Sequence, residues 1–225
     1  MKIFVAGSGK LANAILTSGL FSQSGEIQKW ESLDQSLNEK VIVIHAGSGR
    51  QSGECFDYCA RTKSVYIELA TGLKTETAEP DFPLIICPNT SILVLKTLHA
   101  LKSNGRYFRD YEISITESHQ STKTTEPGTA FAFASSFDFP TDKIISVRDP
   151  RVQQNEIGIL TEYLDKHAYH KIVIKDGNDE VTIETKVLGH DSYARGVKII
   201  AEAIMKNQLE NRKYTVLDLI DNGML

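Results

Sequence analysis

The sequence predicts an α/β protein, in which a doubly wound, Rossmann-like domain is joined to a second α+β domain built on an open mixed sheet. Two observations lead to this fold class. Up to residue 88, short apolar runs alternate with segments of helix length, which is typical of a parallel sheet wound with helices. After residue 110, apolar and polar residues alternate one by one, which indicates strands of a largely antiparallel sheet with one dry face.

Five strands are expected in the first domain, over residues 2–6, 25–30, 41–45, 64–69 and 82–87. Residues 41–44 are all apolar, so we expect the third strand to be covered on both faces. The first strand should lead into a helix, because apolar residues then recur at helical spacing, at Leu11, Ile15, Leu16 and Leu20.

A helix over residues 91–103 should open the second domain, followed by alternating strands over 111–117, 171–174 and 180–187. The last two strands read as a hairpin, because a turn containing Gly177 separates them. A final helix over residues 192–207 should return the chain to the first domain. The predicted domains are therefore residues 1–88 with 192–225, and residues 89–191.

The composition of the chain limits the binding partners and the cellular compartments that we expect for this protein. A chain of 225 residues with 41% hydrophobic content can bury a substantial core. Its formal net charge of -4 argues against a nucleic-acid-binding surface. No apolar run approaches the roughly 20 residues that span a bilayer, and the first residues leave no room for a signal peptide. We therefore expect no nucleic-acid or membrane partner and a cytoplasmic location.

The cysteines also favour a reducing compartment, because Cys55, Cys59 and Cys87 are too few for a disulfide framework. Cys55 and Cys59 stand four apart on a predicted helix, a spacing that could place two thiolates together. We favour small buried hydrophobes, since no second pair of ligands accompanies them. No metal site is expected.

A glycine turn after the first strand carries the strongest cofactor signal of the first domain. The pattern Gly7-x-Gly9-x-x-Ala12 lets the backbone turn sharply and approach a pyrophosphate at the start of a helix. The expected cofactor ligands here are Gly7, Ser8, Gly9, Lys10 and Leu11. The domain is therefore expected to bind a dinucleotide.

The choice between NADH and NADPH stays open at this point. Glu31 follows the predicted second strand, where an acid would accept hydrogen bonds from a ribose diol, but an ordinary exposed glutamate fits equally well. Lys10 could attract a 2′-phosphate instead. Arg50, in the glycine loop after the third strand, could contact cofactor or substrate, or be solvated.

The loop that leaves the strand over 111–117 gathers groups suited to acid-base chemistry on an anion. His119 can donate a proton near neutral pH, and Lys123 adds a cation four residues later. Pro127-Gly128-Thr129-Ala130 then looks like a helix start with free N–H groups. The remaining histidines carry weaker signals: His45 is expected to be packed and hydrogen-bonded, and His167 and His170 are expected to be structural rather than metal ligands.

On these residues the sequence resembles the dihydrodipicolinate reductase family. The family's Glu-x-His-His-x-x-Lys is matched by Glu117, His119 and Lys123, and its Pro-Ser-Gly-Thr-Ala stretch by residues 127–130. Further similar segments occur in the family's order across nearly the whole chain, at residues 70–72, 87–91, 168–172 and 192–196.

The resemblance implies NADH- or NADPH-dependent reduction of a cyclic imine dicarboxylate, the 4-hydroxy-tetrahydrodipicolinate reductase step of lysine (diaminopimelate) biosynthesis. It implies His119 as proton donor or acceptor and Lys123 as a second donor or charge stabiliser. It implies a small-molecule dicarboxylate as partner and a homotetramer. Substrate would contact Gln120, Gly128 and Thr129, and further dinucleotide ligands would be Leu69, Ala70, Thr71, Cys87, Pro88, Asn89 and Thr90.

The chain departs from the family pattern in its substrate loop. Gln120 replaces the second histidine and cannot carry charge. No serine stands between Pro127 and Gly128. Two alternatives therefore remain: an NAD(P)-dependent oxidoreductase acting on another imine or amino acid, and a non-catalytic nicotinamide-binding protein.

Overall fold

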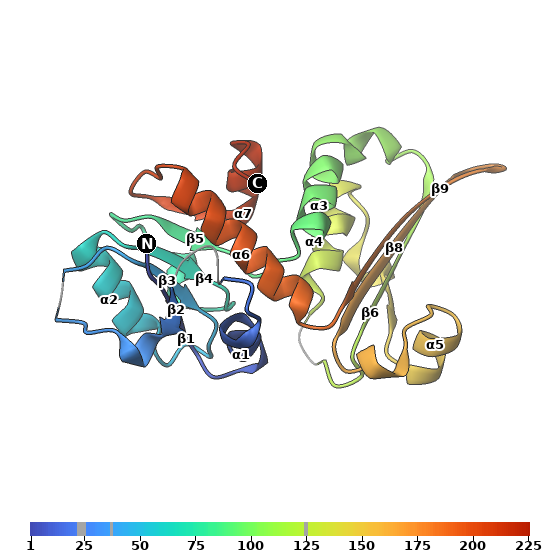
Figure 1. The fold of residues 1–225 in the computed structure, drawn as a ribbon. Helices are drawn as coiled ribbons and strands as arrows, with labels where there is room; N and C mark the ends of the chain where they lie inside the picture. The colour runs from blue at the N-terminus through green and yellow to red at the C-terminus, as the bar shows by residue number, and fades with distance from the viewer. Residues whose placement is uncertain (22–25, 37, 124–125) are drawn as a thin grey trace. The chain divides into compact units, whose positions relative to one another are not determined.

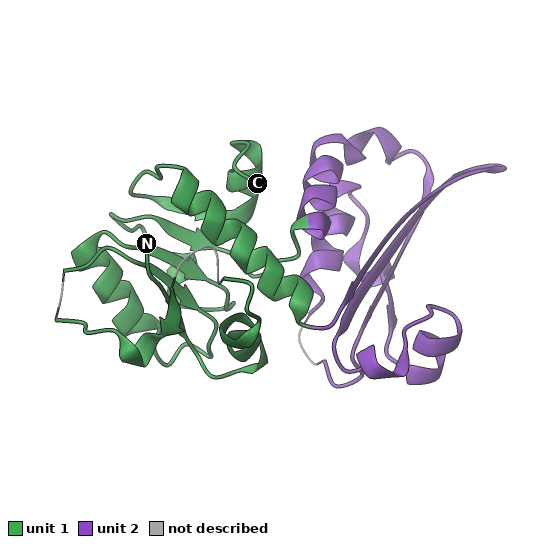
Figure 2. Ribbon diagram, in the orientation of Figure 1, with its two compact units in different colours: residues 1–92, 190–225 green, residues 93–189 purple. Residues whose placement is uncertain are grey.

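The computed structural model describes residues 1–21, 26–36, 38–123 and 126–225. The chain divides into two compact units, residues 1–92 with 190–225, and residues 93–189 (Figure 2). The sequence placed the two boundaries at 88/89 and 191/192, and the role assigned to each predicted domain stays a prediction. Among the described residues, no helix combines the length and the apolar character needed to cross a membrane.

Unit 1 is built on a six-stranded, wholly parallel sheet in the order β10-β5-β4-β3-β1-β2 (Figure 1). This arrangement confirms the predicted Rossmann-like class. Gly25, where the second strand was expected to begin, lies outside the described residues. The strands are β1 (Ile3–Ala6), β2 (Ile27–Lys29), β3 (Ile42–His45), β4 (Val65–Glu68), β5 (Leu84–Ile86) and β10 (Lys213–Thr215).

Helices cover both faces of the sheet in unit 1. Alternate strand residues such as Phe4, Val43 and Tyr66 pack with helix α2 (Ser52–Thr62) in one apolar cluster. Helices α1 (Lys10–Thr17) and α6 (Asp191–Lys206) pack against each other (Figure 1). Every residue of β1, β3 and β4 is buried, as a doubly covered parallel sheet requires. The unit ends with helix α7 (Val216–Asp221).

Unit 2 contains a four-stranded mixed sheet in the order β7-β6-β8-β9. Its strands are β6 (Glu112–His119), β7 (Ile145–Val147), β8 (His167–Asp176) and β9 (Asp179–Leu188), and only the β6–β7 pair is parallel. Strands β8 and β9 form the predicted hairpin, with Asp176 paired to Asp179 and Gly177 at φ +57° in the turn. Helices α3 (Ile92–Asn104), α4 (Gly128–Ser136) and α5 (Pro150–Asn155) complete the unit.

Several elements differ from the sequence prediction; helices α5 and α7, for example, were not predicted. Helix α1 stops at Thr17, so Leu20 lies beyond it, because Gly19 turns the chain with φ +64°. Strands β7 and β10 were not predicted. Each has only three residues, too few for a repeat of apolar and polar positions to show.

Helix α6 reaches the loop after β5 through a glycine. A Cβ added at Gly196 would overlap the backbone carbonyl oxygen of Thr90, whose hydroxyl donates to the carbonyl of Tyr193 at 2.9 Å. The helix therefore needs glycine at this position in order to pack on the sheet.

Gly196→Ala should lower the free energy of unfolding by about 3 kcal/mol or more, because two backbones would have to separate. Gly53→Ala is the matched control: nothing lies within 4 Å of its added Cβ, so stability should be unchanged or higher. Urea denaturation followed by circular dichroism measures both. Equal stability of the two variants would contradict the packing described.

Candidate functional site

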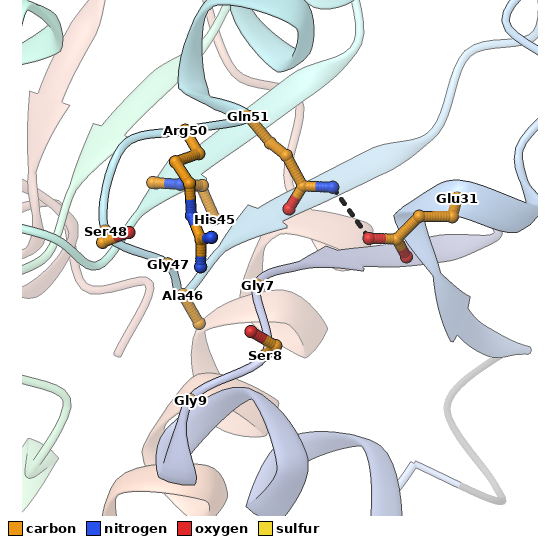
Figure 3. A pocket seen from close by; sticks show the side chains of 10 residues that line it. All are labelled: Gly7, Ser8, Gly9, Glu31, His45, Ala46, Gly47, Ser48, Arg50 and Gln51. Atoms are coloured by element: carbon orange, nitrogen blue, oxygen red, sulfur yellow. Dashed lines mark hydrogen bonds between the residues drawn. The ribbon is translucent and has the colours of Figure 1, made fainter.

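The carboxyl edge of the unit 1 sheet holds a cavity of about 600 Å³ (Figure 3). It lies where β1 and β3 end, the edge at which parallel α/β sheets bind ligands. It is lined by Gly7, Ser8, Gly9, Glu31, His45, Ala46, Gly47, Ser48, Arg50 and Gln51. The cavity therefore gathers the predicted glycine turn, Glu31 and Arg50 in one place.

The backbone of the glycine turn lies in close contact with the loop after β3. Gly7 has φ +128°, and a Cβ there would come within 2.6 Å of the Ala46 carbonyl oxygen. Glycine is thus required for both conformation and space. Gly9 caps α1, whose first-turn N–H groups have no partner within the helix and can bind phosphate oxygens. These features fit a dinucleotide pyrophosphate.

Glu31 lies on a single 3₁₀ turn after β2, η1 (Trp30–Ser32), and not in the strand itself. The Gln51 side-chain amide donates to its carboxylate at 2.7 Å, as Figure 3 shows. Hydrogen bonds from Gln51 and from its own backbone, with the charge of Lys29, lower the pKa of Glu31 despite slight burial. Glu31 is therefore an ionised carboxylate at neutral pH, fixed at one side of the cavity.

A buried polar network lies at the ends of β3 and β4. His45 is packed and hydrogen-bonded, as expected: its Nδ1 lies 2.6 Å from Glu68 Oε1, with 1% and 0% of the two side chains exposed. Glu68 also accepts from the Tyr66 hydroxyl at 3.0 Å and the Ala70 N–H at 3.0 Å. The network ties β3 to β4 and to the loop after β4.

The other predicted dinucleotide ligands stand at the same sheet edge but do not line this cavity. Lys10 and Leu11 begin α1, and Leu69, Ala70 and Thr71 follow β4. Of the residues after β5, which are Cys87, Pro88, Asn89 and Thr90, both Cys87 and Thr90 are buried. The Cys87 thiol donates to the Asn89 carbonyl at 3.2 Å. Their roles with a cofactor stay predictions.

In unit 2, the end of β6 carries a buried carboxylate held between a histidine and an arginine. Glu117 is fully buried; its Oε2 lies 2.6 Å from His119 Nδ1, and its Oε1 accepts from Arg148 at 2.6 Å. Residues two apart on a strand face the same side. Parallel pairing of Ser118 with Val147 brings the two residues that follow them, His119 and Arg148, to this carboxylate.

This pairing sets the charge of the carboxylate. Burial alone would raise the pKa of Glu117, but hydrogen bonds from His119, Arg148 and Ser146 outweigh it and lower the pKa from 4.5 to about 2. Glu117 is therefore ionised, and it binds the Nδ1 hydrogen of His119. The other ring nitrogen, Nε2, is then the atom that can exchange a proton.

His170 packs beside His119. The two ring centroids are 5.8 Å apart, and Phe133 of α4 lies 5.4 Å from His170 on the same face of the sheet. Burial and the charge of His119 lower the pKa of His170 to about 4, so it is neutral at neutral pH. The uncharged ring of His170 therefore packs against the His119 ring.

The opposite face of β6 holds a second polar network. Ser118 Oγ lies 2.9 Å from His167 Nε2 and accepts from Gln153 Nε2 at 3.0 Å. Gln153, on α5, also donates to the His119 carbonyl at 2.8 Å. This network fixes the backbone of His119. Among the described residues, no group of three or more His, Cys, Asp and Glu side chains is arranged to hold a metal ion.

The predicted substrate residues follow His119 along the chain. The Lys123 N–H donates to the Gln120 carbonyl at 3.0 Å in a turn, and Gly128 and Thr129 form the first turn of α4. Burial and the charge of Arg148 lower the pKa of Lys123, while Glu117 opposes this. Thr124 and Thr125, part of the same loop, lie outside the described residues.

Sequence reasoning missed Arg148, His170 as a neighbour of His119, and Gln153. Glu117 was matched to a motif without being given a role. These contacts depend on how β6 pairs with β7 and β8. A single sequence carries only the weak signal that residues 117 and 119 share a face.

A family model describing the C-terminal part of dihydrodipicolinate reductase matches residues 94–220, more than half of the chain. The chain belongs to the dihydrodipicolinate reductase family. This confirms the resemblance inferred from the His119 loop, which the matched range includes.

Relatives of this dihydrodipicolinate reductase family member are of modest identity. The chloroplastic 4-hydroxy-tetrahydrodipicolinate reductase 2 of Arabidopsis thaliana is 31% identical over 168 residues, 68% of this chain and 48% of that protein. The reductase of Rickettsia canadensis is 28% identical over 148 residues, 64% of this chain and 61% of that protein. The chain thus spans between 35% and 48% of the length of the four plant relatives it matches.

Among solved structures, a dipicolinate-bound dihydrodipicolinate reductase from Paenisporosarcina sp. TG-14 has a TM-score of 0.65 at 17% identity. The match covers 96% of this chain and 97% of that one. A probable dehydrogenase from Thermotoga maritima has a TM-score of 0.52 at 10% identity. At such identities the likeness supports the fold of this family member.

Glu117→Gln tests the buried carboxylate. A folded-state pKa near 2 against 4.5 in the unfolded chain means that Glu117 contributes stability above pH 4.5 and loses it as the pH falls toward 2. The stability difference between wild type and Glu117→Gln should therefore be largest above pH 4.5 and shrink below it. Urea denaturation across pH 2 to 7 measures this, with Glu112→Gln, at an exposed position of the same strand, as the matched control.

Glu68→Ala tests the network in unit 1. Removing Glu68 leaves His45, Tyr66 and the Ala70 N–H without their shared acceptor, so the free energy of unfolding should fall by about 3 to 5 kcal/mol. Asp57→Ala, on the exposed side of α2, should change it by less than about 0.5 kcal/mol. Chemical denaturation compares them, and a Glu68→Ala variant as stable as Asp57→Ala would contradict the network.

Proposed function

We propose that this chain catalyses the 4-hydroxy-tetrahydrodipicolinate reductase reaction, the NAD(P)H-dependent reduction of a cyclic imine dicarboxylate in lysine (diaminopimelate) biosynthesis. The observation that carries the proposal is the buried Glu117 carboxylate bonded to Nδ1 of His119, within the region matched to the family. The pair presents an oriented imidazole as the acid-base group. The relatives named above as 4-hydroxy-tetrahydrodipicolinate reductases support the substrate class.

In this proposal unit 1 binds the dinucleotide. Backbone N–H groups of the glycine turn and the start of α1 would hold the pyrophosphate, and Glu31 would face a ribose. The reduced nicotinamide, when bound, supplies the hydride for an unsaturated ring carbon of the substrate. The chain contributes binding, orientation and proton transfer.

Residues of unit 2 would donate the proton, stabilise negative charge on the substrate and bind one of its carboxylates. His119 would donate a proton through Nε2, and ionised Glu117 would stabilise the imidazolium form while fixing the ring. The ammonium of Lys123 would stabilise negative charge that develops on the substrate. One substrate carboxylate would accept hydrogen bonds from Gly128 and the hydroxyl of Thr129 at the start of α4, with the amide of Gln120 as a further donor.

A second candidate keeps the fold and the cofactor but changes the substrate to another imine or amino acid. The observation that favours it is Gln120, which replaces a histidine of the family motif with a neutral amide. Competition between freshly generated hydroxytetrahydrodipicolinate and other small imine acids, followed by oxidation of the reduced nicotinamide, separates the two candidates.

We also propose assembly into a homotetramer and a reducing compartment such as the cytoplasm. Strand β9 forms an edge of its sheet, and Val181 on β9 and Ile145 on the opposite edge are 53% and 55% exposed, which favours pairing with a further copy. Free Cys55, Cys59 and Cys87 are all buried, as suits a reducing environment. Light scattering of the purified chain measures the oligomer size.

His119→Asn and Lys123→Ala should each lower kcat by about 10²- to 10⁴-fold, because each removes a group that interacts with developing charge. Both variants should retain dinucleotide binding, measured by calorimetry. Lys102→Ala, an exposed lysine of α3, is the control and should keep full activity. A non-catalytic nicotinamide-binding protein would instead bind the dinucleotide without any turnover in the wild type.

A further inference from the structure

The Glu117 carboxylate binds a different partner through each of its oxygens. Oε2 lies 2.6 Å from His119 Nδ1, and Oε1 accepts from a terminal guanidinium nitrogen of Arg148 at 2.6 Å. The other terminal nitrogen of Arg148 donates to the Val147 carbonyl at 3.0 Å, so the guanidinium is itself held at two points. The carboxylate cannot rotate without losing one of its two short contacts. Arg148 therefore helps to fix the oxygen that faces His119.

The charge of Arg148 also acts on the histidine. A guanidinium keeps its proton throughout the pH range in which proteins are folded. The Arg148 side chain is 27% exposed, so water screens its charge only in part. It binds the same carboxylate whose negative charge stabilises the imidazolium form of His119. The arginine therefore offsets part of that stabilisation.

From this arrangement we infer that Arg148 is a positioning residue for proton transfer by His119, which orients Glu117 and leaves the imidazolium able to release its proton. The inference rests on the proposed function, in which His119 donates through Nε2. The Nε2–H bond would break, the proton would pass to the substrate, and a neutral ring would stay bonded to ionised Glu117. General acid catalysis weakens as the donor becomes a weaker acid, so an unopposed carboxylate would slow this step.

The other buried pair of the chain holds its histidine without an arginine. Glu68 lies 2.6 Å from His45 Nδ1, and it also accepts from two neutral donors, the Tyr66 hydroxyl and the Ala70 N–H. Orienting a histidine therefore does not in itself require a cation on the second carboxylate oxygen. Arg148 accompanies the pair whose histidine is more exposed, as a role in proton transfer requires.

The remaining ionisable groups around His119 act differently from Arg148. On β8, burial lowers the pKa of His170 to about 4 and also lowers the pKa of His167. Lys123 adds a cation from the loop, and burial and the charge of Arg148 lower its pKa. Helix α4 contains no charged residue, and α5 contacts the His119 backbone through a neutral amide. Of these groups, Arg148 is the one that joins a permanent charge to the carboxylate directly.

Proton NMR titration of the full chain, without substrate, tests the inference at the His119 ring, whose signal is assigned by its loss in His119→Asn. Arg148→Gln keeps an amide donor but removes the charge. It should raise the pH at which the ring is half protonated by about 1 pH unit, because a cation is removed at close range. Arg148→Met should shift this midpoint in the same direction, and Glu117→Gln should shift it downward.

Arg148→Lys restores the charge and should return the midpoint toward the wild-type value. Arg151→Gln, at an exposed arginine of α5, is the matched control and should leave the midpoint unchanged. A midpoint that stays or falls when Arg148 is replaced by Gln or Met would overturn the inference, as would a lysine variant that behaves like Arg148→Gln. If one uncharged variant does not fold, the other decides.

Turnover of freshly generated hydroxytetrahydrodipicolinate separates this inference from the proposed function. Arg148→Gln should lower kcat about threefold at neutral pH and move the alkaline fall of kcat/KM upward, whereas Glu117→Gln should move that fall downward. Wild-type turnover with an alkaline fall that does not move in Arg148→Gln would overturn the inference alone. Without wild-type turnover, the proposed function would fail, and the role of Arg148 in proton transfer with it.

Discussion

A single buried carboxylate organises the chemistry of unit 2. An ionised group in the protein interior is costly unless it is paired and hydrogen-bonded, and Glu117 meets this need with donors from its own strand and from the residue after β7. Its charge binds the Nδ1 hydrogen of His119 and leaves Nε2 as the ring nitrogen that can exchange a proton. Without it, the imidazole could rotate and change tautomer.

The residues around Glu117 and His119 also help to fix the position and charge of the His119 ring. His170 stays neutral and adds no competing positive charge beside His119. Gln153 holds the His119 backbone from the other face of β6. Gln153 belongs to the short helix α5, and Arg148, the other donor to Glu117, directly follows the three-residue strand β7.

The sequence predicts those strands whose apolar residues follow a regular pattern. Uninterrupted apolar runs predicted β1, β3 and β5, and one-by-one alternation predicted the β8–β9 hairpin, because burial on one or both faces leaves its own period. The glycine turn was recognisable because Gly7 fills a position that no side chain can occupy. Arg148 and Gln153 were not predicted. Their contacts with Glu117 and His119 depend on strand register and on the placement of a helix, which no local sequence pattern indicates.

The two units contain the same chemical pair with different consequences. In each, a fully buried glutamate lies 2.6 Å from the Nδ1 of a histidine. The side chain of His45 is only 1% exposed, and among the described residues no group bonds to its buried Nε2. The side chain of His119 is 14% exposed, beside a loop that carries a lysine. The difference in burial is what makes one pair a structural tie between strands and the other a candidate acid-base group.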